Sequence, residues 1–207
     1  GTPSGTVDLR SGRLRDSSAR DNINKATAVP PATKPECPLW LDFLHDATGG
    51  DIELIRLLQQ IAGYSLTGDI REHALFFIYG PGGNGKSVYL NTITRILGDY
   101  AQTAAMATFE KQSNNGIPAD LAMLNGARLV TASETEEGKP WAEARIKQMT
   151  GGDPITARFM RQNFFTFTPR FKLLIVGNHK PVLSSVDDAM RRRFNIIPFT
   201  IKPASPD

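Results

Sequence analysis

Hydrophobic residues recur with a helical period in two stretches, at residues 39–47 and 51–61. In the second stretch Asp51 stands at the N-cap position and Gly63 follows the last apolar residue. The pattern therefore predicts a small helical subdomain over residues 37–70.

From residue 71 onward, short apolar runs alternate with helical patterns. Strands are expected at residues 74–79, 128–133 and 171–177, and helices at residues 87–97 and 141–149. Such alternation is typical of the α/β class, in which helices cover a parallel sheet.

The first 36 residues carry only weak patterns. Two short apolar arms on either side of Ser11 and Gly12 predict a small hairpin, and a polar, proline-containing linker follows it. An isolated hairpin is marginal in stability, so we expect residues 1–36 to dock on the rest of the chain.

Composition limits the class of protein. With 207 residues and a hydrophobic fraction of 40%, the chain can form one ordinary domain with an appendage. The single cysteine, Cys37, excludes an internal disulfide and a cysteine-based zinc site. Apolar runs are too short to cross a bilayer and the first residues lack a signal-peptide pattern, so we expect an intracellular protein with no membrane partner.

The net charge of +3 is unevenly distributed. Residues 141–202 hold eleven Lys and Arg against four Asp and Glu. This imbalance indicates either a polyanionic partner or a solvated basic face.

The segment after the first predicted strand fits the phosphate-binding pattern G-x-x-x-x-G-K-[ST]. Its residues are Gly80, Pro81, Gly82, Gly83, Asn84, Gly85, Lys86 and Ser87. The glycines allow backbone N–H groups to face a phosphate, Lys86 can reach the β- and γ-oxygens, and the Ser87 hydroxyl can hold Mg²⁺. The sequence thus predicts a site for ATP or another nucleoside triphosphate with Mg²⁺.

Glu134 follows the strand predicted at residues 128–133. An acid at the carboxyl end of a strand beside the P-loop strand could hold the Mg²⁺ shell and deprotonate the attacking water. Glu136 or Glu137 could share this role, and an ordinary loop carboxylate is the alternative.

Asn178 ends the strand predicted at residues 171–177. Its amide could bind the γ-phosphate or the attacking water without adding charge. His179 follows and is a weaker candidate for a catalytic base, because a single loop histidine is more often without such a role.

Between these strands, β-rich arms surround residues 160–163 and predict a hairpin with Arg161 near its tip. Arg158 and Arg161 are the candidates for contact with solvent or nucleic acid, since single-strand sites combine basic and aromatic side chains. Phe164, Phe165 and Phe167 are expected mostly in the core.

Three arginines, Arg191, Arg192 and Arg193, precede a final apolar run. They suit a solvated turn, or an arginine finger that neutralises γ-phosphate charge in its own subunit or in a neighbour. A finger supplied to a neighbour requires a dimer or a ring.

Taken in order, these motifs resemble the superfamily 3 helicase domain of phage and plasmid primase-helicases. The matching segments are residues 80–87, 132–138, 147–153, 177–181 and 190–194, while residues 7–12 and 37–44 look like the poxvirus-type region that precedes the ATPase. The resemblance implies an AAA+-like ATPase core over residues 71–207 that assembles into a ring, usually a hexamer, and moves on single-stranded DNA.

The resemblance also implies individual roles. Lys86 and Ser87 would bind phosphate and Mg²⁺, and Glu134 would be the Walker B acid, sharing the Mg²⁺ site with Ser87. Asn178 would be the sensor. Arg158 and Arg161 would contact DNA from a pore hairpin, and Arg193 would be the finger, with Arg192 as its substitute.

Two departures from the family qualify this reading. Similar proteins often carry a bulky apolar or aromatic residue where Arg191 stands, so the motif alone does not identify which arginine is the finger. Members usually carry a primase domain before this region and helical sequence after it, so we expect a C-terminally truncated core and a primase domain or protein as a partner, in the cytoplasm of a bacterial host. A P-loop kinase and a non-enzymatic nucleotide- or DNA-binding prophage remnant are the alternatives.

Overall fold

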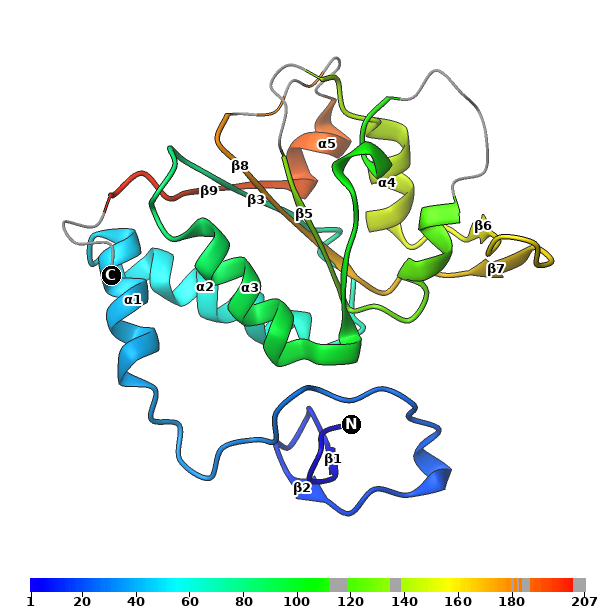
Figure 1. Ribbon diagram of the computed structural model, residues 1–207, viewed down its shortest axis with the longest axis horizontal. Helices are drawn as coiled ribbons and strands as arrows, with labels where there is room; N and C mark the ends of the chain where they lie inside the picture. Colours follow the sequence, from blue (N-terminus) through cyan, green and yellow to red (C-terminus); the bar gives the residue numbers. More distant parts are fainter. Residues whose placement is uncertain (112–118, 135–138, 180, 182, 184–186, 203–207) are drawn as a thin grey trace.

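A parallel sheet of five strands forms the centre of the computed structural model (Figure 1), which describes residues 1–111, 119–134, 139–179, 181, 183 and 187–202. In spatial order the strands are β4 (Ala101–Thr103), β5 (Leu129–Ser133), β8 (Lys172–Gly177), β3 (Leu75–Tyr79) and β9 (Phe194–Pro198). The expected α/β class and parallel sheet are confirmed. Strand β4 was not predicted, because its three residues carry no apolar run.

Strand β3 lies between two strands from much later in the chain. Leu75 is in register with Leu173 of β8 and with Phe194 of β9, while Tyr79 is in register with Gly177 and Pro198. All four strand pairings of this sheet are parallel. The amino ends of the strands therefore lie along one side of the sheet, which we call the amino edge, and their carboxyl ends lie along the opposite side, the carboxyl edge.

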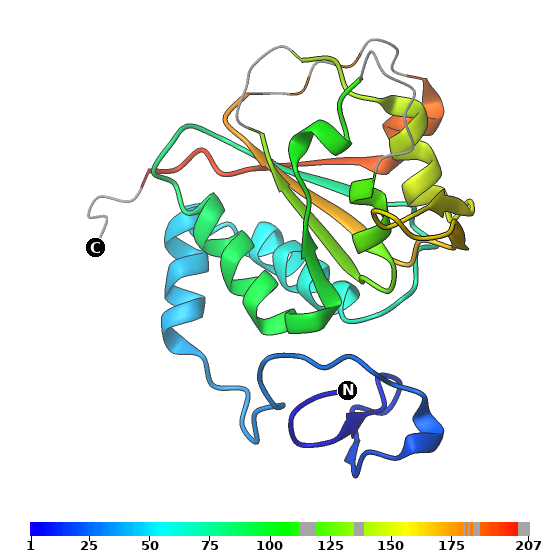
Figure 2. The same cartoon turned by 45° about the vertical axis from the view of Figure 1, so that its right-hand side comes forward.

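Helices cover both faces of the sheet (Figures 1 and 2). One face carries α1 (Pro38–Thr48), α2 (Ile52–Ser65) and α3 (Lys86–Leu97), and the other carries α4 (Glu143–Gly151) and α5 (Asp188–Arg193). Side chains of β3 alternate between the two resulting cores, with Phe76 and Ile78 in the first and Phe77 in the second. Strands buried on both faces read as continuous apolar runs, which explains why β3, β5 and β8 are visible in the sequence.

The predicted helices agree with the observed bounds within two residues, apart from the end of α2, and α5 is an additional helix. The Asp51 side chain accepts a hydrogen bond from the Leu54 N–H at 3.0 Å, which confirms the N-cap of α2. Gly63 does not end this helix, which continues to Ser65. Helix α5 was not predicted; it has six residues and is capped by the side chain of Asp187.

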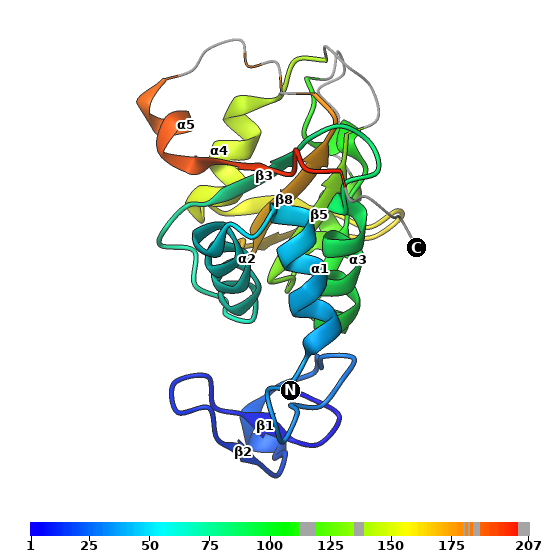
Figure 3. The ribbon, with the colours of Figure 1, turned by 90° about the vertical axis from the view of Figure 1, so that its left-hand side faces the viewer.

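The N-terminal segment docks on the C-terminal end of α3 (Figures 1 and 3). Its hairpin consists of β1 (Thr6–Val7) and β2 (Leu14–Arg15), which pair antiparallel as predicted. The Ala28 N–H donates to the Ile96 carbonyl at 3.0 Å, and the Asp99 N–H donates to the Ala26 carbonyl at 3.1 Å. Short 3₁₀ segments complete the described structure: η1 (Ala19–Asp21), η2 (Gly98–Tyr100), η3 (Met106–Thr108) and η4 (Ala119–Leu124).

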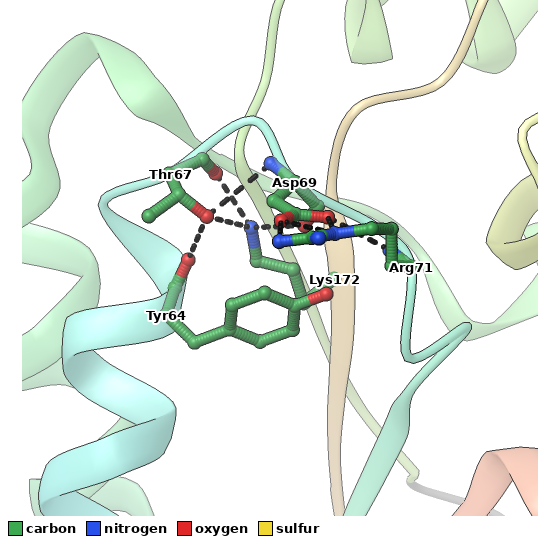
Figure 4. A network of polar contacts seen from close by, with 5 residues as sticks. All are labelled: Tyr64, Thr67, Asp69, Arg71 and Lys172. Atoms are coloured by element: carbon green, nitrogen blue, oxygen red, sulfur yellow. Dashed lines mark hydrogen bonds and ion pairs between the residues drawn. The ribbon is translucent and has the colours of Figure 1, made fainter. Parts of the chain in front are cut away.

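A buried lysine joins the loop after α2 to the sheet (Figure 4). The Lys172 ammonium group donates to the carbonyl oxygens of Thr67 at 2.5 Å and Asp69 at 3.1 Å, and it lies 4.3 Å from the centre of the Tyr64 ring. Burial, and to a lesser extent the Arg128 charge, lower the pKa of Lys172 to about 8. This lysine therefore fixes the connection between the helical segment and β8.

No helix in the described ranges is long and apolar enough to cross a membrane.

Candidate functional site

At the carboxyl edge of the sheet, the connections that follow neighbouring strands run to opposite faces. Strand β3 leads into α3 on one face, whereas β5 and β8 lead towards α4 and α5 on the other face. In open α/β sheets, ligands bind outside the carboxyl ends of strands at such a point of divergence. The loop of residues 80–87, which we call the 80–87 loop, lies at this position.

Lys86 folds back over the 80–87 loop. Its ammonium group donates to the carbonyl oxygens of Gly80 at 2.6 Å and Pro81 at 2.9 Å, and to Asn84 Oδ1 at 3.0 Å. The residue is buried at the first position of α3, and this burial lowers the pKa of its ammonium group. A concave loop that presents a lysine and a helix N-terminus fits a phosphate group.

The 80–87 loop is held from behind by the chain that follows β9. The Asn84 side-chain amide donates to the Phe199 carbonyl oxygen, and the Phe199 N–H donates to the Tyr79 carbonyl at 2.7 Å. A Cβ atom on Gly80 would stand 1.8 Å from the same Phe199 oxygen, so only glycine fits there. The contribution of Phe199 was not predicted, because nothing in the sequence indicates which segment crosses behind the loop.

Glu134 lies at the same edge of the sheet, directly after β5. Its N–H donates to the Val176 carbonyl at 2.8 Å, and a Cβ atom on Gly177 would come within 2.4 Å of its buried Oε2 atom. The Gly177 carbonyl in turn accepts the Gly80 N–H at 3.3 Å. Gly177 thus separates the carboxylate from the start of the 80–87 loop.

The expectation that Glu134 follows a strand directly beside β3 is wrong, because β8 lies between β5 and β3. Gly177 has no side chain at that point, so the Glu134 carboxylate occupies space over the end of β8.

Ser87, Asn178 and His179 are exposed at the carboxyl edge of the sheet. Glu136 and Glu137, which could share the role of Glu134, lie outside the described residues. Within the described part of the chain, no group of three or more His, Cys, Asp or Glu could hold a metal by itself. A site with one hydroxyl and one carboxylate instead fits Mg²⁺, which usually retains waters and takes further oxygens from substrate phosphates.

The three arginines lie at the opposite edge of the sheet. Phe194 begins β9 in register with Leu75, the first residue of β3, so residues 191–193 precede the amino edge. The five residues of β3 separate that edge from the 80–87 loop by about 16 Å, at 3.3 Å per residue.

Arg193 is fixed by two hydrogen bonds. Its Nε–H donates to Thr150 Oγ1 at 3.1 Å and its Nη1–H donates to the Ala189 carbonyl at 2.9 Å. Arg192 is more exposed and donates from Nε to the Asp188 carbonyl at 3.2 Å. Both arginines line an open cavity of about 390 Å³ together with Arg71, Glu72 and His73.

A short hairpin follows α4, as the sequence predicts (Figure 1). Strands β6 (Ile155–Ala157) and β7 (Phe165–Phe167) pair antiparallel, and residues 158–164 form the turn. Arg161 lies in this turn with a φ of 61°, in the left-handed region, and its side chain is exposed.

Aromatic side chains shape the hairpin tip. The Arg158 guanidinium lies 5.0 Å from the centre of the Phe164 ring, and the rings of Phe159 and Phe165 stack with their centres 5.6 Å apart. Phe167 is buried, and Phe165 packs against the core as predicted. Phe164 is 53% exposed, so its expected core position is wrong: the strands are three residues long and leave it in the turn.

Comparison with known proteins gives a family for this arrangement. A model described as a family of unknown function, DUF5906, matches residues 78–193. The chain belongs to the DUF5906 family. The matched region contains the 80–87 loop, Glu134, the β6–β7 hairpin and Arg193. A second model, described as D5 N terminal like, matches residues 1–49.

Viral proteins are similar to this DUF5906 member over most of its length. "Putative helicase L207/L206" of Acanthamoeba polyphaga mimivirus is 28% identical over 98% of the chain, which covers 22% of the viral protein. "Primase D5" of Fowlpox virus is 25% identical over 77% of the chain, which covers 20% of that protein. Together with the N-terminal match, these relatives support a D5-type primase-helicase relationship. The chain spans about a fifth of the length of these relatives.

The fold also matches a solved structure. The apo structure of the NrS-1 C terminal region superposes with a TM-score of 0.66 at 15% identity, covering 84% of this chain and 41% of the other. This likeness concerns the fold.

Proposed function

We propose that the chain is the motor core of an ATP-dependent DNA helicase or translocase of the superfamily 3 type, with an AAA+-like P-loop core. One observation carries the proposal. Strand register gathers the 80–87 loop, Glu134 and Asn178 at the carboxyl edge of the sheet and leaves Arg192 and Arg193 at the amino edge.

ATP and Mg²⁺ fit the carboxyl edge. Lys86 would exchange its bonds to the loop carbonyls for bonds to β- and γ-phosphate oxygens, and Ser87 with Glu134 would hold the Mg²⁺ shell. Glu134, whose carboxylate lies over Gly177, would orient and deprotonate a water, and Asn178 would sense the γ-phosphate.

The arginines favour hydrolysis between subunits. An arginine side chain cannot bridge the roughly 16 Å from the amino edge of β3 to the 80–87 loop of its own subunit, by the strand rise alone. A ring or another head-to-tail assembly would bring Arg193 of one copy against the nucleotide of the next. Arg193 is the better finger, because Thr150 already fixes its guanidinium.

The β6–β7 hairpin would contact single-stranded DNA. Its tip combines exposed Arg158 and Arg161 with exposed rings, which provide charge for phosphates and flat surfaces for bases. The names of the viral relatives, a helicase and a primase, support a role in replication and association with a primase.

ATP hydrolysis measured with and without single-stranded DNA, alongside light scattering, tests the proposal. Turnover that rises with DNA in a large assembly is expected. Phosphoryl transfer to a small metabolite that ignores DNA would instead indicate a P-loop kinase, and a monomer that binds nucleotide or DNA without turnover would indicate a non-enzymatic remnant.

A further inference from the structure

Thr150 lies where three segments meet: Arg193 at the end of α5, the residues that lead into β3, and the β6–β7 hairpin. It is the penultimate residue of α4, is 1% exposed, and directly precedes the glycines that lead into β6. Its side chain and its carbonyl both contact residues far away in the sequence, and each contact leads to a different part of the candidate site.

The side chain of Thr150 holds the proposed finger. Its Oγ1 accepts the Arg193 Nε–H at 3.1 Å while donating to the Ile146 carbonyl at 2.7 Å. The hydroxyl therefore has a fixed orientation, since its proton points into the helix and a lone pair faces the guanidinium. The two bonds of Arg193 use Nε and Nη1 and leave Nη2 for a further acceptor.

The carbonyl of Thr150 contacts the segment that leads into β3. It accepts a hydrogen bond from His73 Nδ1 at 3.0 Å, which requires the proton on Nδ1 because a carbonyl only accepts. His73 has a φ of 49°, an uncommon conformation for a residue with a side chain, and it stands two residues before β3. Strand β3 ends at the 80–87 loop of the same subunit.

Only a short link separates Thr150 from the hairpin. Helix α4 ends at Gly151, its C-cap residue Gly152 reverses the chain with a φ of 81°, and β6 begins at Ile155. The Gln148 side chain donates to the Pro154 carbonyl at 3.1 Å and ties this link to the last turn of α4. The link between the last turn of α4 and β6 is therefore short and held by a hydrogen bond.

We propose that Thr150 is a positioning residue that couples Arg193 to the base of the β6–β7 hairpin, so that capture of a neighbouring subunit's nucleotide phosphate by Arg193 shifts the hairpin that contacts DNA. This inference rests on the proposed function and adds to it the residue through which the nucleotide and the DNA sites communicate. His73 connects the same turn to the start of β3, and the other end of β3 leads into the 80–87 loop of the same subunit.

The test compares Thr150→Val with Thr150→Ser. Valine preserves shape and removes the hydroxyl, whereas serine retains it. Thr48→Val is a matched control, because Thr48 is also buried at the end of a helix and donates to the carbonyl four residues before it, at 2.8 Å, in α1. Each variant is assayed in the full chain for ATP hydrolysis with and without single-stranded DNA, for DNA affinity with ADP and with a non-hydrolysable ATP analogue, and for melting temperature.

Thr150→Val is expected to bind ATP and DNA. It should lose most of the stimulation of ATP hydrolysis by DNA, and most of the difference in DNA affinity between the ADP-bound and the analogue-bound protein. Thr150→Ser and Thr48→Val should keep both. Wild-type stimulation in Thr150→Val, or an equal loss in Thr48→Val, overturns the coupling while leaving the proposed function intact. A wild-type chain whose turnover ignores DNA contradicts the proposed function and the coupling together.

Discussion

Gly177 lies so close to Glu134 that a Cβ atom at this glycine would come within 2.4 Å of the glutamate Oε2 atom. The same Cβ would stand 2.7 Å from the Phe77 ring, which is fully buried. A larger residue at this position would have to displace the Glu134 carboxylate or the buried Phe77 ring.

Gly177→Ala is therefore expected to displace Glu134 and to reduce ATP hydrolysis by about tenfold or more, a loss of roughly 1.4 kcal/mol in transition-state stabilisation. ATP binding, measured by fluorescent nucleotide titration, should persist because Lys86 is untouched. Gly63→Ala is the control: its Cβ meets open space within α2, and it should preserve activity and raise stability by about 0.5–1 kcal/mol. Wild-type turnover in Gly177→Ala would remove Glu134 from the mechanism.

Lys86→Ala should abolish ATP hydrolysis and weaken nucleotide binding, because the ammonium group that lies over the 80–87 loop is the one proposed to bind the β- and γ-phosphates. Lys34→Ala removes an exposed lysine outside the site and should behave like wild type. The measurement is steady-state phosphate release, with circular dichroism to verify folding. Normal turnover by Lys86→Ala would refute the assignment.

The separation between Arg193 and the 80–87 loop predicts complementation between two inactive variants. Lys86→Ala and Arg193→Ala should each hydrolyse little ATP alone, yet mixed assemblies would contain some interfaces with an intact loop from one copy and an intact arginine from the other. Turnover should therefore rise on mixing. A mixture of Arg193→Ala with the Lys86→Ala/Arg193→Ala double variant has no such interface and should stay inactive. If the first mixture also stays inactive although both variants assemble, the finger does not act between subunits.

Arg161→Asn should weaken single-stranded DNA binding and lower its salt dependence, with a change of about 0.7 in the slope of log K against log salt for each lost phosphate contact. Asparagine tolerates the left-handed conformation of this position, so the turn should persist. Arg10→Asn, at the tip of the N-terminal hairpin, is the matched control. Titrations at several salt concentrations provide the slopes, and an unchanged slope removes Arg161 from the DNA contact.

Lys172 predicts a pH dependence of stability. Its pKa is about 8 in the folded chain against a usual value of 10.5, so the unfolded chain binds more protons between these values. The free energy of unfolding should therefore rise with pH across this window, by up to about 3 kcal/mol at 1.36 kcal/mol for each unit of pKa. Below about pH 8 Lys172 is charged in both the folded and the unfolded chain, so burial of its charge lowers the free energy of unfolding by the full amount. Urea titrations from pH 7 to 10.5 should show a smaller rise in Lys172→Met, and equal rises would contradict the assignment.

The sequence predicted those parts of the fold that depend on local patterns. The runs that became β3, β5 and β8 are buried on both faces, and the 80–87 loop has a fixed spacing. Strand β4 and helix α5 were missed because three and six residues are too few to display a period.

Other features of the candidate site depend on pairing between distant segments. The position of β8 between β5 and β3, and the contact of Phe199 with Asn84, result from parallel pairings that leave no local signal. The distance of Arg193 from the 80–87 loop of its own chain follows from the register of β9 with β3. Phe164 was misplaced because alternation alone does not reveal where a three-residue strand ends.

The central place of β3 has a consequence for how the protein is made. Both of its neighbouring strands come from residues about a hundred positions later, which takes a ribosome roughly 5–20 s to synthesise at 5–20 residues per second. During that interval the apolar segment Leu75–Tyr79 lacks both of its partner strands, which is the condition in which apolar segments are prone to aggregate. The 80–87 loop, which Phe199 holds from behind, thus takes its final shape late in synthesis, after β9 has emerged.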